Sequence, residues 1–281
     1  MAEQKFSSFF TGTEIFLKDH TIKGQHVLPG VAYLEMAREA VMQSADTDIE
    51  SIQIHLENIV WSRPIVSDQA GVRINISLYS NEKEQIDYEI YSGDNDQILH
   101  SQGTAIIKQK EKSDILDLSL IRSKCTKGQL SPDNCYAAFR NVGLEYGPGH
   151  QGIKEVYIGD GEVLSKVSLS PLEHDYILHP GIMDSALQAS IGLVLGDTNK
   201  DEAPTKPMLP FALNEVQIHA RCEEVMWVHI KYSEDHAKSE QIQKLDIDLL
   251  DESGKICVRM KGYTSRILEE KNENTKNHLL L

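Results

Sequence analysis

The sequence has few cysteines and no long apolar run. Its four cysteines are scattered without a CxxC pair: Cys125, Cys135, Cys222 and Cys257. Neither a zinc ribbon nor a disulfide framework is therefore indicated. No apolar segment approaches the roughly 20 residues of a membrane-spanning helix, and the opening Met-Ala-Glu-Gln-Lys lacks the features of a signal peptide. These absences predict a cytoplasmic protein with reduced thiols and no membrane span.

Positive charge is also scarce. The chain carries 28 lysines and arginines against 43 aspartates and glutamates, a net charge of −15. Such a balance argues against general binding of nucleic acid or of anionic membranes. With 281 residues, 40% of them hydrophobic and 25% charged, the chain is long enough for one large or about two smaller globular domains.

Residues 20–44 predict a histidine-bearing turn that leads into an amphipathic helix. Pro29 and Gly30 suit the first helical positions. Apolar residues follow helical spacing at Val31, Leu34, Ala37 and Val41. Polar residues mark the expected solvent side at Glu35, Arg38, Glu39 and Gln43. The free N–H groups of the first turn suit a developing oxyanion, and His20 is placed to accept a proton. A helix cap beside a solvent-exposed histidine is the alternative.

Strand patterns surround this helix and recur after it. Expected strands in the first half are 7–17, 52–66, 72–79, 86–91 and 98–107. In the second half they are the hairpin 152–159 and 163–169, then 213–219, 226–232, 245–250 and 256–263. A second helix, 180–196, opens with Pro180-Gly181, 151 residues after Pro29-Gly30. We therefore predict a duplicated unit: subdomain 1–108, linker 109–131, subdomain 132–269 and a disordered tail, 270–281.

The second helix contains one charged residue. Asp184 lies in an otherwise uncharged stretch that is expected to be buried, and burial raises a carboxyl pKa. The sequence therefore predicts a neutral acid able to protonate a leaving group. Gln188, four residues further along, lies on the same helix face and is expected to hydrogen-bond it. A purely structural carboxylate is the alternative.

Three motifs occur together in the chain. They are His20-xxx-Gly24-xxxx-Pro29, Tyr146-Gly147-Pro148, and His179-Pro180-xxx-Asp184-xxx-Gln188. In this order the set resembles the polyketide synthase dehydratase domains, and the resemblance extends through Leu209-Pro210-Phe211. It implies an α+β double hotdog, two antiparallel sheets each wrapped around a long helix. His150 stands where family members often have phenylalanine, a form similar to dehydratases of bacterial synthases with free-standing acyltransferases (trans-AT).

The resemblance also implies a reaction. The substrate is a β-hydroxyacyl thioester on the phosphopantetheine arm of an acyl carrier protein, and the product is the α,β-unsaturated thioester. His20 is expected to be the base and Asp184 the acid, with Gln188 orienting the acid or the hydroxyl. The N–H of Gly30 is expected to hold the thioester oxygen. Partners are the carrier protein, neighbouring synthase domains and a second copy in a homodimer; no cofactor besides the arm is expected.

The other motif residues have supporting roles in this hypothesis. Tyr146 is expected to hydrogen-bond substrate or catalytic groups, and Pro148 to stiffen its loop. Three further histidines are predicted to be non-catalytic: His26 in a loop, His150 in the pocket wall and His179 at a helix start. A metal site built from His20, His150 and Asp184 is disfavoured because no HxxxH or HxH spacing occurs.

Two other classes of function use the same scaffold. One is an enoyl isomerase or an oxa-Michael cyclase, whose members, as the resemblance implies, often replace the catalytic aspartate that is present here. The other is a non-catalytic module that docks the carrier protein. The complete set of His20, Tyr146, Asp184 and Gln188 argues against this second alternative.

Overall fold

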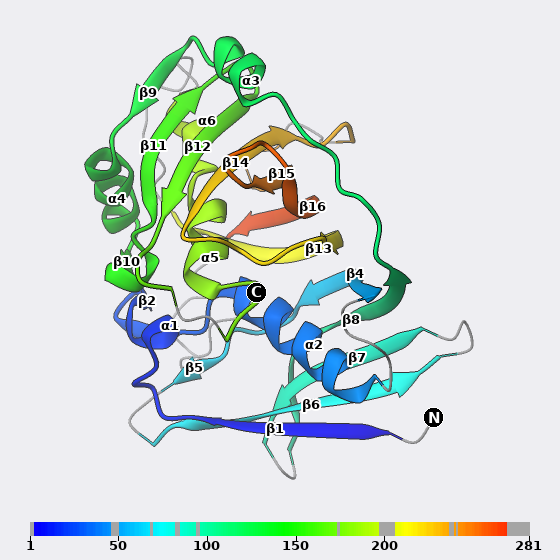
Figure 1. Cartoon of the computed structure of the whole chain (residues 1–281). Coiled ribbons are helices and arrows are strands. Elements are labelled where there is room, and N and C mark those ends of the chain that lie inside the picture. Colours follow the sequence, from blue (N-terminus) through cyan, green and yellow to red (C-terminus); the bar gives the residue numbers. More distant parts are fainter. Residues whose placement is uncertain are drawn as a thin grey trace.

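A single antiparallel sheet of twelve strands dominates the fold (Figure 1). The computed structural model describes residues 3–45, 51–67, 70–81, 85–93, 96–172, 175–196, 206–235, 239 and 241–268. In this part of the chain, no helix is both long and apolar enough to cross a membrane. The strand order is β1-β6-β7-β8-β4-β13-β16-β15-β14-β12-β11-β9, so strands from each half of the chain occupy one half of the sheet.

The two halves meet where β4 pairs with β13. Strands of the first half are β1 (Gln4–Phe10), β4 (Ile52–Trp61), β6 (Val72–Ser80), β7 (Ile86–Ser92) and β8 (Ile98–Gln109). Those of the second half are β9 (Gly128–Leu130), β11 (Ile153–Ile158), β12 (Glu162–Ser168), β13 (Met208–Ile218), β14 (Val225–Tyr232), β15 (Ile242–Leu250) and β16 (Ile256–Ile267). The predicted hairpin across Asp160-Gly161 is confirmed as β11 and β12.

Each half of the sheet curves around a buried helix. Helix α2 (Gly30–Ser44) packs against β4, β6, β7 and β8. Helix α5 (Pro180–Gln188), followed by α6 (Ile191–Leu195), packs against β11 and β12. All nine residues of α5 are buried, as expected for a helix whose one charged residue is Asp184. The helices α2 and α5 also touch one another.

A second, four-stranded sheet joins the two halves again. Its order is β10-β2-β3-β5, with β2 (His20–Ile22), β3 (Gln25–Val27), β5 (Val66–Ser67) and β10 (Leu144–Tyr146). Strand β10 comes from the second half and the others from the first. The remaining helices are α1 (Ile15–Lys18), α3 (Leu118–Lys124), α4 (Pro132–Asn141) and the single 3₁₀ turn η2 (Pro148–His150).

Two predicted strands are shorter in the structure, and the helix predicted over 180–196 is divided into α5 and α6. The strand expected over 7–17 ends at Phe10, and Ile15–Lys18 is helical; Gly12 has a φ of 84°, which ends the extended conformation. The strand expected over 52–66 ends at Trp61. The domain limits at 108 and 132 stay a prediction.

Residues 109–131, interpreted as a linker, carry secondary structure of their own. They contain α3, and β9 pairs with β11. Ile121 and Cys125 pack with Tyr157 and Leu164 in a small apolar cluster. Because successive strand residues point to opposite faces, this cluster lies on the sheet face opposite α5, whose core includes Val156 and Val163. The segment therefore covers one face of the second half.

Glu35 and Arg38 are buried, so their predicted place on the solvent side of α2 is wrong. Their exposed fractions are 5% and 6%, whereas Glu39 and Gln43 are exposed as expected. Glu35 accepts two hydrogen bonds at 2.8 Å from Arg38. It also accepts the backbone N–H groups of residues 177 and 178, both at 2.9 Å. This carboxylate thus ties α2 to the segment that enters α5.

We expect Glu35→Gln to lower the free energy of unfolding by about 3 kcal/mol, since it leaves the buried Arg38 without its buried anionic partner. Glu39→Gln is the matched control: Glu39 also accepts from Arg38 but is exposed, so its loss should stay below about 1 kcal/mol. Urea unfolding near pH 7 measures both. Equal losses in the two variants would contradict the role of Glu35 in joining the helices.

Candidate active site

His20 lies on β2, and its tautomer is set by a backbone carbonyl. The β2–β3 hairpin turns through Lys23 and Gly24, with φ of 48° and 79°, the geometry of a two-residue type I′ turn. This turn brings Val27 back beside His20, whose Nδ1 donates to the Val27 carbonyl at 2.7 Å. The proton is therefore on Nδ1, and Nε2 carries the free lone pair.

Tyr146 faces His20 from the other half of the chain. The two residues are directly paired between β10 and β2, and their rings meet edge to face at 5.5 Å. Asp19 fixes the loop that follows: its carbonyl accepts from the N–H of Gly147 at 2.7 Å, and its Oδ2 accepts from the N–H of Gly149 at 2.7 Å. Pro148 begins η2, is exposed, and does not line the cavity.

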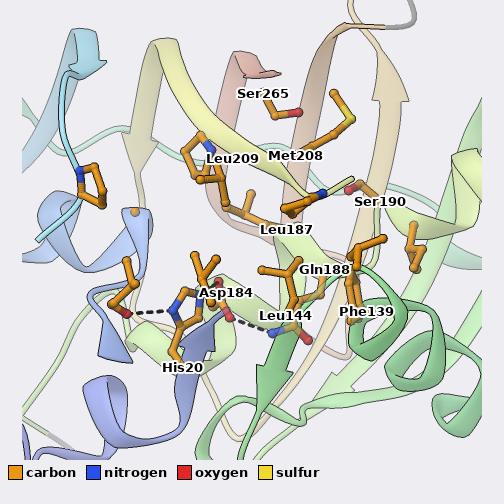
Figure 2. Close-up of a pocket in the computed structure, with 18 of the residues that line it drawn as sticks. His20, Phe139, Leu144, Asp184, Leu187, Gln188, Ser190, Met208, Leu209 and Ser265 are labelled. Atoms are coloured by element: carbon orange, nitrogen blue, oxygen red, sulfur yellow. Dashed lines mark hydrogen bonds and ion pairs between the residues drawn. The ribbon is translucent and has the colours of Figure 1, made fainter. Parts of the chain in front are cut away.

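Asp184 lies on α5 with its carboxylate held by two donors. Its Oδ2 accepts from Nε2 of Gln188 at 2.7 Å, which is the hydrogen bond expected from their i, i+4 spacing. It also accepts from Nδ1 of His150 at 2.9 Å. The other oxygen, Oδ1, lies 3.9 Å from Nε2 of His20. Figure 2 shows His20 and Asp184 facing each other, with Gln188 beside the carboxylate.

The electrostatics of this pair overturn one prediction. Burial alone raises the pKa of Asp184, but nearby His20 and the hydrogen bonds from His150 and Gln188 together lower it below its usual value. The expected raised pKa of Asp184 is therefore wrong. For His20, burial outweighs the attraction of Asp184 and lowers the pKa. The imidazole is thus neutral at pH 7, as a base must be.

Gly30 lies at the N-terminus of α2 and lines the same cavity. Its N–H lies in the first turn of the helix, and the N–H groups of a first turn have no acceptor within the helix. Its carbonyl accepts from the indole N–H of Trp61 at 2.9 Å. A Cβ at this position would lie 2.9 Å from Cγ of Pro210, so the close approach of Pro210 requires glycine.

The cavity between these residues has a volume of about 180 Å³. Its walls are mostly apolar and come from both halves of the chain. The first half contributes Val27, Leu28 and Trp61. The second half contributes the residues labelled in Figure 2, Phe139, Leu144, Leu187, Met208 and Leu209. Two cations, Arg63 and Lys206, and three uncharged polar side chains, Ser190, Gln243 and Ser265, also line it. In the described part of the chain, no group of three or more His, Cys, Asp or Glu is arranged to hold a metal.

The three other histidines take different places. His26 is exposed on β3. His179 caps α5 by accepting the N–H of Ile182 at 3.4 Å, which confirms its predicted place at the helix start. His150 was expected in the pocket wall, but it is fully buried and absent from the cavity lining. Its contact with Asp184 joins positions 34 residues apart in the chain, so the sequence could not reveal this contact. It showed only that the residue type at position 150 is unusual.

An imidazole and a carboxylate that face each other in a mostly apolar cavity are suited to acid–base chemistry. Residues 114–275 match the family described as "Polyketide synthase dehydratase N-terminal domain", and residues 1–93 match "Polyketide synthase dehydratase domain". The chain belongs to the polyketide synthase dehydratase family. It is a dehydratase domain of that family.

Relatives place this domain within much longer proteins. The chain is 44% identical over 99% of its length to polyketide synthase PksM of Bacillus subtilis, of which it spans 7%. It is 43% identical over 96% of its length to PksN of the same organism, of which it spans 5%. These relatives are multidomain synthases, and the chain corresponds to one small part of them.

Solved structures confirm the double hotdog fold. A trans-AT PKS dehydratase domain from Brevibacillus brevis is 43% identical, with a TM-score of 0.90 over 96% of this chain and 95% of that one. The CurK dehydratase domain of the curacin synthase is 22% identical, with a TM-score of 0.84 over 98% and 95% of the two chains. The second likeness shows the fold alone; the first confirms the predicted likeness to trans-AT dehydratases.

We expect His179→Asn to make the protein less sensitive to acid. Burial lowers the pKa of His179 to about 4, against about 6.5 in the unfolded chain. Because the unfolded state then binds the proton more tightly, stability is lost as pH falls from about 6.5 towards 4. This group accounts for about 2 kcal/mol of that loss between pH 7 and pH 5.

Asparagine keeps an oxygen acceptor for the helix cap but does not titrate. Denaturant unfolding at pH 7 and pH 5 measures the difference. If wild type and variant lose the same stability between these two pH values, the assignment of His179 as a partly buried neutral cap is wrong.

Proposed function

We propose that His20 and Asp184 are the base and the acid of a dehydration of a β-hydroxyacyl thioester carried on a phosphopantetheine arm. The observation that carries the proposal is the 3.9 Å approach of Nε2 of His20 to Oδ1 of Asp184 inside the cavity. Two solved forms of the CurK dehydratase are inactive mutants, one with histidine replaced by phenylalanine and one with aspartate replaced by asparagine. These support the same pairing of roles.

The base step uses the free lone pair of His20. Nε2 removes the proton from the α-carbon, and the electrons of that C–H bond form the Cα–Cβ double bond. The Val27 carbonyl holds the opposite nitrogen and stabilises the imidazolium that results. The N–H of Gly30, at the start of α2, donates to the thioester oxygen as negative charge develops on it.

The acid step uses the oxygen of Asp184 that faces His20. Oδ1 donates a proton to the β-hydroxyl as the C–O bond breaks, and water leaves. The free site favours the carboxylate, and an acyl chain that displaces water from the cavity favours the neutral acid. After release, the proton that His20 took from the α-carbon is available to Oδ1 of Asp184 for the next turnover. Burial, with Asp184 nearby, raises the pKa of Tyr146 well above its usual value, so its phenol stays a hydrogen-bond donor for the substrate.

The cavity lining also fits the proposed carrier. Arg63 and Lys206 line a site in a chain of net charge −15, and cations there suit the phosphate of the arm. An acidic domain has no overall attraction for an acidic carrier protein, so tethering in one synthase supplies effective concentration instead. The four cysteines are free and buried, which fits the proposed cytoplasmic location. A homodimer remains a prediction from the family resemblance.

The alternatives find less support in the geometry. An enoyl isomerase can remove and return a proton with one group, so it does not need an acid held opposite the base. An oxa-Michael cyclase carries out the reverse kind of addition and could use the same pair, but no observation favours it over dehydration. A non-catalytic docking module has no use for a buried carboxylate, whose desolvation is unfavourable. Dehydration gives His20, Asp184, Tyr146 and Gly30 each a role, and we propose no cofactor besides the carrier arm.

We expect His20→Ala and Asp184→Asn each to lower the dehydration rate by about 10²–10⁴-fold, the usual value of one general acid or base. His26→Ala, which removes an exposed histidine of the adjacent strand, is the matched control and should keep the wild-type rate. Mass spectrometry of a carrier-bound 3-hydroxyacyl chain follows the loss of one water. Near wild-type elimination by a folded His20→Ala protein would remove the base assignment.

We expect Lys206→Glu to raise KM for the carrier-bound substrate by about tenfold, equal to roughly 1.4 kcal/mol, with little change in kcat. A pantetheine thioester without the phosphate should show no such increase. Lys154→Glu makes the same charge change at an exposed position outside the cavity and serves as the control. If KM rises equally for both substrates, Lys206 does not act through the phosphate.

A further inference from the structure

His150 is a buried histidine that the proposed reaction does not use directly. It lies in η2, is 0% exposed, and does not line the cavity. Among the described residues its Nε2 has no hydrogen-bond partner. A buried polar atom without a partner costs free energy, so an apolar ring would serve packing better. A histidine at this position therefore needs a reason beyond stability.

The contacts of His150 converge on the carboxylate of Asp184. Nδ1 of His150 lies 2.9 Å from Oδ2 of Asp184. The backbone carbonyl of His150 accepts from Nε2 of Gln188 at 3.0 Å, the same nitrogen that donates to Oδ2 of Asp184 at 2.7 Å. The 3₁₀ turn is held in place by a hydrogen bond from the N–H of Gly149 to Oδ2 of Asp19. Asp19 is the neighbour of His20 in the chain.

We propose that His150 is a positioning residue whose Nδ1–H occupies Oδ2 of Asp184 and so confines the acidic proton to Oδ1, the oxygen that faces His20. The inference rests on the proposed function, because it gives the acid its direction. Oδ2 already accepts two N–H donors, and a proton there would meet a donor instead of an acceptor. Only Oδ1 is then free to carry the proton towards the cavity.

The same geometry explains the electrostatic environment. The His150 hydrogen bond is one of the causes that together lower the pKa of Asp184 against its burial. It stabilises the carboxylate left after each turnover, and it prevents rotation of the carboxyl group. A positioning role of this kind affects kcat more than KM, because His150 does not contact the cavity.

Three substitutions distinguish the effect of the Nδ1–H donor from the effect of the size of the ring. His150→Phe keeps the ring without a donor. His150→Asn places an N–H donor near the position of Nδ1, whereas His150→Gln places one near the position of Nε2. We expect kcat of the phenylalanine and glutamine variants to fall on the order of 10²-fold with KM little changed. The asparagine variant should return to within about tenfold of wild type.

A direct readout accompanies the rates. Carbon-13 NMR of labelled aspartate, with the Asp184 signal assigned by its loss in Asp184→Asn, follows the ionisation of this carboxyl in the free enzyme. We expect its pKa to rise by about one unit in His150→Phe and His150→Gln and to stay near the wild-type value in His150→Asn. If the phenylalanine variant does not fold, the asparagine and glutamine pair carries the comparison.

Two outcomes overturn the inference: an unchanged Asp184 pKa and kcat in the variants without an Nδ1 donor, or asparagine no better than glutamine. Failure of the proposed function looks different. If Asp184→Asn retains dehydration, the acid assignment itself falls whatever His150 does. If Asp184→Asn is inactive while the His150 variants behave as wild type, only the role of His150 falls.

Discussion

The antiparallel pairing of β2 with β10 is the contact on which the site depends. It sets Tyr146 of the second half directly opposite His20 of the first. From there a continuous series of hydrogen bonds runs through Asp19, the 3₁₀ turn and His150 to the carboxylate of Asp184. These contacts hold the helix that carries Asp184 in a fixed position relative to the strand that carries His20, and they set the distance between the two side chains.

The sequence alone identified the groups whose local pattern is informative. The i, i+4 spacing of Asp184 and Gln188, the Pro-Gly helix starts and the hairpin at Asp160-Gly161 all follow from short-range rules. The burial of Glu35 did not, because its partners at residues 177 and 178 lie more than 140 positions away. The pKa of Asp184 was misjudged for the same reason: its burial was visible in the sequence, but the donor from His150 was not.

Residues 109–131 illustrate a further limit of sequence patterns. Their charge and weak periodicity are typical of a linker, yet α3 buries only Ile121 and needs no strong amphipathic pattern to do so. A short helix that covers part of a sheet face presents one or two apolar residues. The strand β9 has three residues, too few for an alternating pattern to be detected.

The pairing of β4 with β13 has a consequence for how the domain folds. Backbone hydrogen bonds run across the boundary between the halves, so a separated half presents a long edge strand with unpaired N–H and C=O groups. Such edges recruit other strands and lead to aggregation. The two halves therefore protect each other's edges, and each half depends on the other to cover the backbone groups of that strand.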